Sequence, residues 1–241
     1  GGLQLRADTH SYIAVTGATL RLTINGKTAE QWTVHKVQPS DLIELGMVTK
    51  GLRAYVAVAG GFNITPQFGS TATVLREGIG GLAGNKLQAG DTLSAQTVNK
   101  LQRQRLPARY RPQFNQTLTL RLIEGYQAGS FSSTERQRFY LHRYTVTPQA
   151  DRMGYKLNGT AIKCQQRSLL SEGICYGAVQ IPPDGQPIVL LNDRQTLGGY
   201  PKMGSVLSLD CALLAQAGAF TEVFIRPMSP EQWDYAFFLA M

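Results

Sequence analysis

Short runs in which apolar or β-branched side chains alternate with polar ones recur along the whole chain. Each run is bounded by Gly, Asn, Asp or Pro, which is typical of short antiparallel strands. The runs predict strands at residues 12–16, 20–24, 42–45, 54–59, 118–123, 140–146, 188–191, 206–209 and 221–225. Helical signals are few: Ser229, Pro230 and Glu231 begin one helix near the C-terminus, and residues 213–216 add a turn or two. The pattern therefore predicts a mostly β protein with few helices.

A basic segment containing prolines, residues 100–111, separates two stretches of predicted strands. Each stretch contains an aliphatic strand followed by a pair of glycines, residues 56–61 in the first and 188–199 in the second. We therefore place a domain boundary in the basic segment. The first predicted lobe covers residues 1–105, and the second covers residues 106–241 and carries the C-terminal helix.

The net charge of +8 raises the possibility of a nucleic-acid partner. In the basic segment only Tyr110 is an aromatic residue, so it resembles a solvated linker or a contact for an acidic protein more than a nucleic-acid surface. Cys164, Cys175 and Cys211 lack metal or redox spacing and fit reduced thiols in the cytoplasm. No stretch approaches the ~20 apolar residues of a membrane helix, so we expect no membrane span.

Two familiar kinds of site have weak support in this sequence. Residues 78–83 match the spacing G-x-G-x-x-G/A, but strand-like residues follow where a dinucleotide motif needs a helix. His10, His35 and His142 are far apart and lack partners at metal-ligand spacing, so we expect no metal. The glycines are then either a plain loop or a backbone nest for an anion.

Polar, proline and glycine residues crowd around one apolar strand in residues 148–204, which indicates a ligand site. Asp151 and Arg152 form either a guanidinium fork that holds a carboxylate or phosphate, or an ion pair that anchors a loop. Glu172 is a candidate general base beside the hydroxyl of Ser171, although both residue types also form local caps. Lys202 is a candidate for stabilising negative charge.

The remaining candidates fit an amide-like substrate. Glutamine amides can donate to and accept from a lactam, ureido or amide group, and glycine backbone N–H groups can reach an oxyanion. The predicted substrate-binding residues are Ser171, Gln180, Gln186, Gln195, Gly198, Gly199 and Tyr200. The predicted catalytic residues are Asp151, Arg152, Glu172 and Lys202. We expect Asp151, Arg152, Gln186, Lys202 and the backbone of the two glycines to line one cleft.

Several blocks of this sequence resemble a known family: DRMGYKL, LLSEG and GAVQIPPDGQPIVLLNDRQTLGGYPKMG in the second half, and GLRAYVAVAGGF and FGSTAT in the first. They are similar to biotin-dependent carboxyltransferases and second subunits of allophanate hydrolase. That family includes the C subunit of bacterial 5-oxoprolinase, the Kip-type antagonist of a kinase inhibitor and the carboxyltransferase region of urea carboxylase. The resemblance implies two cyclophilin-like β-barrel lobes, and it predicts that a front segment with a glycine-rich loop and a helix is missing here.

The resemblance also implies function. The preferred interpretation is a subunit of an ATP-dependent 5-oxoprolinase, which opens the lactam 5-oxoproline to glutamate together with a sibling β-barrel subunit and a further catalytic subunit. ATP then acts at the level of the complex, because this sequence shows neither a phosphate loop nor a biotinyl-lysine motif. The alternatives are a carboxyltransferase of the urea-carboxylase type, supplied with carboxybiotin, and a regulatory protein that antagonises a kinase inhibitor.

Overall fold

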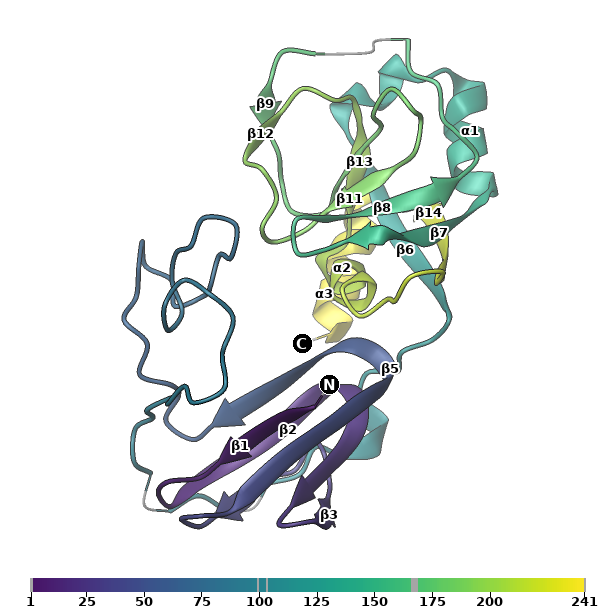
Figure 1. Cartoon of the computed structure of the whole chain (residues 1–241). Coiled ribbons are helices and arrows are strands. Elements are labelled where there is room, and N and C mark those ends of the chain that lie inside the picture. The colour runs from purple at the N-terminus through teal and green to yellow at the C-terminus, as the bar shows by residue number, and fades with distance from the viewer. Residues whose placement is uncertain (1, 99, 103, 166–168, 241) are drawn as a thin grey trace. The chain divides into compact units, whose positions relative to one another are not determined.

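The computed structural model describes residues 2–98, 100–102, 104–165 and 169–240 (Figure 1). It divides the chain into two compact units, Gly1–Gln113 and Phe114–Met241. The prediction of a mostly β protein is confirmed, since strands form the framework of both units and the described residues contain three α-helices. The division between Gln113 and Phe114 lies just after the basic segment 100–111, in which we predicted a boundary.

The first unit is built on a five-stranded antiparallel sheet. Its strands are β1 (Leu3–Arg6), β2 (Ser11–Ile24), β3 (Lys27–Ala29), β4 (His35–Val37) and β5 (Leu42–Val58). β5 lies between β1 and β2, and β2 also pairs with β3 and β4. The small core of this unit consists of Ile13, Val15, Leu20, Leu22, Val37, Ile43 and Leu45.

Glycines join predicted strands into longer ones. The runs at 12–16 and 20–24 are parts of β2, and those at 42–45 and 54–59 belong to β5, whose last residue is Val58. Gly17 (φ 84°) and Gly51 (φ 79°) adopt positive φ, and the pairing of β2 with β5 shifts register after Gly17. Glycine lets each strand bend without ending, because it lacks the Cβ that forbids this conformation. Glycine at these positions also interrupts the alternation of apolar and polar residues from which the strands were predicted.

Residues 59–107 hold only isolated bridges in the described part, and a short 3₁₀ turn, η1 (Ala108–Tyr110), follows. The glycine-rich stretch 78–84 forms turns, and Gly84 N–H donates to the Gly80 carbonyl. No helix begins among the described residues 78–98, so the helix N-terminus that a dinucleotide motif requires is not formed there.

The basic segment is partly paired within its own unit. Arg105 and Arg111 both form ion pairs with Glu30, at 2.8 and 3.0 Å. The hydrogen bond from Arg111 is the main cause that lowers the pKa of Glu30. Arg109 stacks over Tyr110 at 4.8 Å from the ring centre. Arg103, also in this segment, lies outside the described residues.

The second unit is a closed barrel (Figure 1). The barrel order is β10 (Ala178–Gln180), β11 (Ile188–Leu190), β8 (Gly154–Gly159), β7 (Arg143–Ala150), β14 (Glu222–Pro227), β6 (Thr117–Glu124) and β13 (Lys202–Val206). All described pairs are antiparallel except β14 with β6. Beside it, β9 (Glu172–Gly173) and β12 (Leu197–Gly198) form a two-stranded ribbon. The five-stranded sheet of the first unit, by contrast, is open, since β1 and β3 at its edges do not pair with each other in the described residues.

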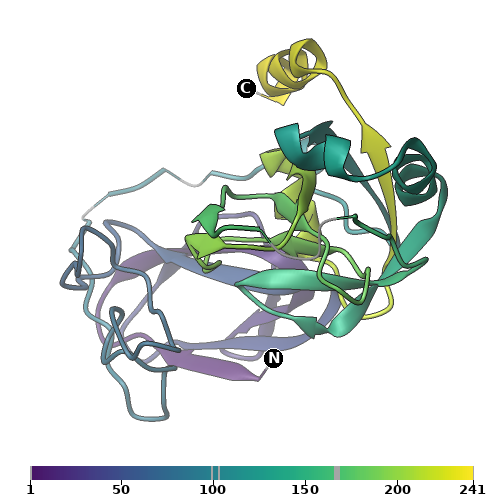
Figure 2. The ribbon, with the colours of Figure 1, turned by 90° about the horizontal axis from the view of Figure 1, so that it is seen from above.

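The barrel interior is filled by side chains at alternating positions of its strands. The fully buried ones include Leu120, Leu122, Tyr144, Tyr155, Leu157, Val179, Val189, Met203, Val223 and Ile225. Helix α2 (Ser208–Leu214) packs on β6, and α1 (Ser133–Leu141) packs on β14. Figure 2 shows α3 (Pro230–Ala240) continuing from the end of β14, outside the ring of strands.

The helices correct two strand predictions. The predicted strand 140–146 begins in α1, which Ser132 caps by accepting from Glu135 N–H. Alternation did not reveal this helix, because Glu135 and Phe139 are its two buried side chains. The predicted strand 206–209 ends in α2, where Asp210 binds Arg121 of β6. The predicted C-terminal helix is confirmed as α3, and Ser229 accepts from Gln232 N–H at its start.

Candidate functional site

An acidic and a basic side chain that are 30 residues apart in sequence meet beside the barrel. Glu172 lies in β9, and Lys202 is the first residue of β13. Lys202 Nζ donates to Glu172 Oε1 in an ion pair. The lysine side chain is 12% exposed and the glutamate side chain 31%. Because solvent reaches this pair only in part, water and salt screen its charges less than they screen a surface pair.

The Glu172 carboxylate is surrounded by donors. It accepts from Lys202 Nζ, from the Tyr126 hydroxyl and from Gln127 Nε2, the last at 2.6 Å. These contacts, that of Lys202 first, hold the pKa of Glu172 below its ordinary value. The hydrogen bond to Glu172 in turn raises the pKa of Tyr126. At neutral pH the carboxylate is therefore ionised and the phenol keeps its proton.

Two glycines lie where the segments that carry these residues meet. Gly125, between β6 and the 3₁₀ turn η2 (Tyr126–Ser130), donates its N–H to the Met203 carbonyl at 3.0 Å. A methyl group on Gly125 would lie 3.4 Å from Gly204 Cα, and one on Gly204 would meet the Ile123 carbonyl. The backbones of β6 and β13 can approach this closely because Gly204 has no side chain, whereas a methyl group on Gly125 would make only an ordinary van der Waals contact. As a result η2 lies against the start of β13.

Gln180 and Gly198 pack next to this cluster. Gln180 is buried in β10 and pairs with Lys202 across the barrel sheet. A methyl group on Gly198 would lie 2.6 Å from Ile174 Cδ1 and 3.0 Å from Gln180 Nε2. Gly198 therefore lets the β9–β12 ribbon lie close to the Gln180 amide.

The ribbon also carries the next predicted residues. The Gly199 carbonyl accepts from Leu169 N–H at 2.9 Å, and a methyl group on Gly199 would lie 3.7 Å from Ser171 Oγ. Tyr200 follows with an exposed ring. The ribbon and the start of β13 thus carry Ser171, Glu172, Gly198, Gly199, Tyr200 and Lys202, with Gln180 beside them.

Asp151 and Arg152 occupy the turn between β7 and β8. Asp151 Oδ1 accepts from the N–H groups of Met153 and Gly154, at 2.8 and 3.2 Å. Arg152 binds Asp193 with its fork, Nε to Oδ2 at 2.8 Å and Nη2 to Oδ1 at 3.0 Å. This geometry is the one expected if Arg152 anchors a loop, because the Asp193 carboxylate already binds the guanidinium on the two nitrogens that a ligand would use.

Two of the predicted glutamines also lie elsewhere. The Gln186 side chain accepts from Gly159 N–H at 2.8 Å and donates to the Gly159 carbonyl at 3.2 Å. It thereby ties the turn before β11 to the end of β8. Gln195 is exposed in the segment between β11 and β12. The roles that we predicted for these residues remain predictions.

The strand register separates the two groups of candidates. Lys202 pairs with Gln180 at the last residue of β10. At the opposite end of the neighbouring strands, Gly154 begins β8 and pairs with Leu190. Arg152 lies just before Gly154. These strands therefore separate Arg152 from Lys202 instead of joining them in the single cleft that we expected.

Tyr126 and Gln127 are site residues that sequence reasoning missed. They lie 46 and 45 residues before Glu172 and outside the polar region from which the site was predicted. Neither belongs to a motif with a known spacing. The available signal was Gly125, two residues after the predicted strand 118–123, which indicates a close approach of two backbones but not the partner.

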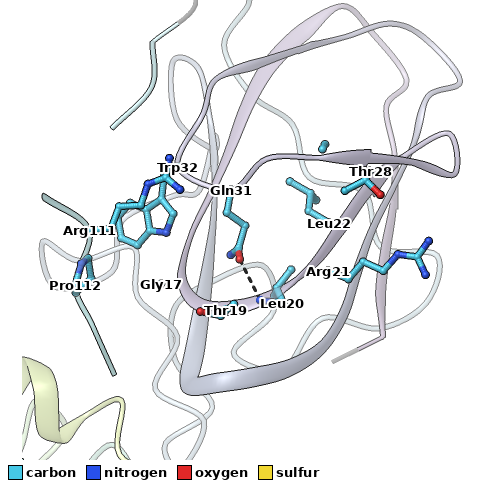
Figure 3. Close-up of a pocket in the computed structure, with 11 residues that line it drawn as sticks. Gly17, Thr19, Leu20, Arg21, Leu22, Thr28, Gln31, Trp32, Arg111 and Pro112 are labelled. Carbon is cyan, nitrogen blue, oxygen red and sulfur yellow. Dashed lines mark hydrogen bonds between the residues drawn. The ribbon is translucent and has the colours of Figure 1, made fainter. Parts of the chain in front are cut away.

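A separate groove of about 310 Å³ lies in the first unit (Figure 3). Trp32, with φ 63°, forms part of its wall. Gln31 points toward β2, where it accepts from Leu20 N–H and donates to the Ala18 carbonyl, both at 3.0 Å. Arg111 is held by Glu30 and by the Leu106 carbonyl. Since Gln31 and Arg111 each already have partners within this unit, we assign the groove no chemistry.

Metal sites and membrane-spanning helices are both absent from the described part of the chain. Within those ranges, no three His, Cys, Asp or Glu side chains gather in a way that could hold a metal ion. Among the same residues, no helix has both the length and the apolar character needed to cross a bilayer.

With the closed barrel and the partly exposed Glu172–Lys202 cluster beside it described, the whole chain can be compared with known classes of domain. The family model described as "Carboxyltransferase domain, subdomain A and B" matches residues 1–227. The chain is therefore a member of this carboxyltransferase-domain family. This confirms the resemblance found in the sequence blocks.

Individual relatives refine this assignment. The chain is 35% identical over 219 residues to the C subunit of 5-oxoprolinase from Escherichia coli (strain K12), covering 90% of this chain and 69% of that protein. It is 32% identical over 218 residues to the protein of the same name in Haemophilus influenzae, with the same coverage. The crystal structure of Kluyveromyces lactis urea carboxylase shares the fold, with a TM-score of 0.87 and 23% identity. That match covers 99% of this chain and 24% of the urea carboxylase chain.

Proposed function

We propose that this chain is a subunit of an ATP-dependent 5-oxoprolinase, which opens the lactam 5-oxoproline to glutamate together with partner subunits. The observation that carries the proposal is the identity of 35% and 32% to two proteins that are each named as the C subunit of 5-oxoprolinase, each match covering 90% of this chain. Cys164, Cys175 and Cys211 are free thiols, which supports a reducing, cytoplasmic location.

The cluster around Glu172 has the chemistry that lactam opening needs. Water adds to the lactam carbonyl, the C–N bond breaks, and the ring nitrogen takes up a proton. In our proposal Glu172 accepts the proton of the attacking water and returns it to the ring nitrogen as the C–N bond breaks, and Lys202 stabilises the charge on the carbonyl oxygen. Tyr126 keeps its proton and donates a hydrogen bond to the Glu172 carboxylate, which it helps to hold in place. In the same proposal, Ser171, Gln180 and Tyr200 bind the substrate amide.

The described residues offer no matching site for ATP. The glycine-rich stretch 78–84 closes on itself in turns and opens no helix in the described residues that follow. A phosphate loop needs backbone N–H groups at a helix N-terminus. We therefore assign ATP to a partner subunit and route no step through it here.

A reconstitution assay tests this function. The full chain and its co-encoded partner subunits should together hydrolyse ATP in the presence of 5-oxoproline and release glutamate, while the chain alone should do neither. L-Proline, which lacks the lactam carbonyl, is the matched substrate control. Glutamate formation that persists when this chain is omitted would refute the proposal. Turnover of urea with biotin and bicarbonate would favour the carboxyltransferase alternative instead.

Charge indicates which part of the chain meets a partner. The first unit contains 13 basic and six acidic residues, whereas the second contains 11 and ten. Nearly all of the net positive charge therefore lies on the first unit, and we propose that an acidic subunit binds there. Association should weaken as salt rises, because exposed charges are screened beyond a distance of about 10 Å at 0.1 M salt.

Size-exclusion chromatography of the co-expressed subunits at low and high salt checks this expectation. The subunits should elute together at low salt, with a larger free fraction at high salt. Elution as separate species under both conditions would contradict a stable complex. Elution together with no effect of salt would contradict the electrostatic contact.

A further inference from the structure

Gln127 is a buried polar side chain whose hydrogen bonds all point into the Glu172–Lys202 cluster. It is 8% exposed. Its Oε1 accepts from Lys202 N–H at 2.9 Å. Its Nε2 donates to Glu172 Oε1 at 2.6 Å and to the Tyr126 hydroxyl at 3.1 Å. One amide thus contacts the backbone of one charged residue and the side chain of the other.

Chemistry fixes the orientation of this amide. The backbone N–H of Lys202 can only donate, so it must face the oxygen of Gln127. An ionised Glu172 can only accept, so it must face the nitrogen. A flipped amide would place two donors together at one end and two acceptors at the other. Glutamine is therefore suited to this position, whereas glutamate could satisfy only the Lys202 end.

The backbone of Gln127 is also held in place. η2 begins at the close approach of Gly125 and Gly204, and Ala128 N–H donates to the Gly125 carbonyl at 2.9 Å. The amide is thus tied to rigid barrel strands. Side chains that are fixed in this way can position reacting groups, because no ordering is needed when the substrate binds.

We infer that Gln127 is a positioning residue, which holds the Glu172 carboxylate beside Lys202 in the geometry that lactam opening requires. The inference rests on the proposed function for the role in catalysis. The positioning itself rests on the three hydrogen bonds. Gln127 acts through Glu172 and Lys202 and does not itself take part in the chemistry.

The inference predicts how Glu172 titrates. The groups that face its carboxylate are Lys202 from β13 and Tyr126 and Gln127 from η2, and all three favour the charged form. Gln127→Met removes one donor, so the pKa of Glu172 should rise toward its ordinary value. Gln127→Glu replaces that donor with a second carboxylate, so the pKa should rise further. In both variants the acid side of the pH–rate profile should move to higher pH, because the base is then protonated at higher pH.

The test combines a titration with kinetics. The Glu172 carboxyl is followed by ¹³C NMR in the full chain with labelled glutamate, assigned with Glu172→Gln, for wild type, Gln127→Met and Gln127→Glu. Circular dichroism and thermal melting confirm that each variant folds. In the reconstituted complex, kcat should fall about tenfold to a hundredfold, as for a misplaced catalytic group, with KM little changed. Gln149→Glu adds the same charge at an exposed position of β7 and should change neither measurement.

The outcomes separate this inference from the proposed function. If Glu172 titrates identically in folded wild type and in both Gln127 variants, the positioning role is overturned. A shift in titration together with a lower kcat supports it. If the wild-type complex shows no 5-oxoproline-dependent turnover but the titration shifts as expected, the proposed function fails and the positioning of Glu172 by Gln127 stands.

Discussion

Replacing Lys202 by methionine should lower the 5-oxoproline-dependent turnover of the reconstituted complex by about a hundredfold to a thousandfold. Loss of one group that stabilises a developing oxyanion typically has an effect of this size. Methionine fills a similar volume without the charge, so the start of β13 should keep its packing. The measurement is glutamate release under saturating ATP, compared with the folded wild-type complex.

The matched control is Lys156→Met in β8. Lys156 also forms an ion pair, with Asp184 at 2.6 Å, but its partner is 46% exposed and lies in a turn. Activity should stay within about twofold, since Lys156 pairs with Asp184 and not with the Glu172 cluster, and breaking a partly exposed pair costs little stability. Lys202→Arg keeps the charge and should retain more activity than Lys202→Met. Equal activity of the methionine and wild-type enzymes would exclude Lys202 from the chemistry.

Asp210→Ala should destabilise the second unit by about 3 kcal/mol. The Asp210 side chain is 3% exposed, and it accepts from Arg121 Nε at 2.9 Å, Nη2 at 2.6 Å and N–H at 2.7 Å. Breaking a buried pair from one side costs about 3–5 kcal/mol, because the remaining charge loses its partner. We expect the lower end of that range, since the Arg121 side chain is 39% exposed.

Urea unfolding measures this effect, followed by hydrogen exchange of peptides from β6 and α2. The control is Glu222→Ala, which breaks an exposed pair with Arg143 between β14 and β7. That change should cost less than about 1 kcal/mol. If the free energy of unfolding fell by a similar amount in both variants, burial would not explain the difference we expect between these ion pairs.

Strand positions followed from local pattern where one side of the strand is buried. In β6 and β14, alternate residues such as Leu120, Leu122, Val223 and Ile225 point into the barrel, and the alternation is visible in the sequence. Helix α3 was predictable from its Ser-Pro-Glu start, because caps act between neighbours in the chain. Helix α1 was not, because its few buried side chains leave little periodicity.

The candidate site was only partly predictable. The density of polar loop residues pointed to a region that contains Glu172 and Lys202, which the fold brings into an ion pair. It also drew in Arg152 and Gln186, which pair with Asp193 and Gly159 instead. An ion pair that anchors a loop and one that serves a ligand use the same residue types, so composition cannot distinguish them.

The sequence by itself determined the mostly β character, the C-terminal helix and the family, because alternation, capping and long matching blocks are properties of the chain as written. Tertiary structure alone decided which polar residues meet. Closing the barrel brings η2, β9 and β13 together, and the glycine at 204 lets β6 and β13 approach. Gln127, Glu172 and Lys202 became neighbours through that closure. Contacts between such distant residues depend on which strands pair with one another across the barrel, and the pattern along one strand does not show its partner.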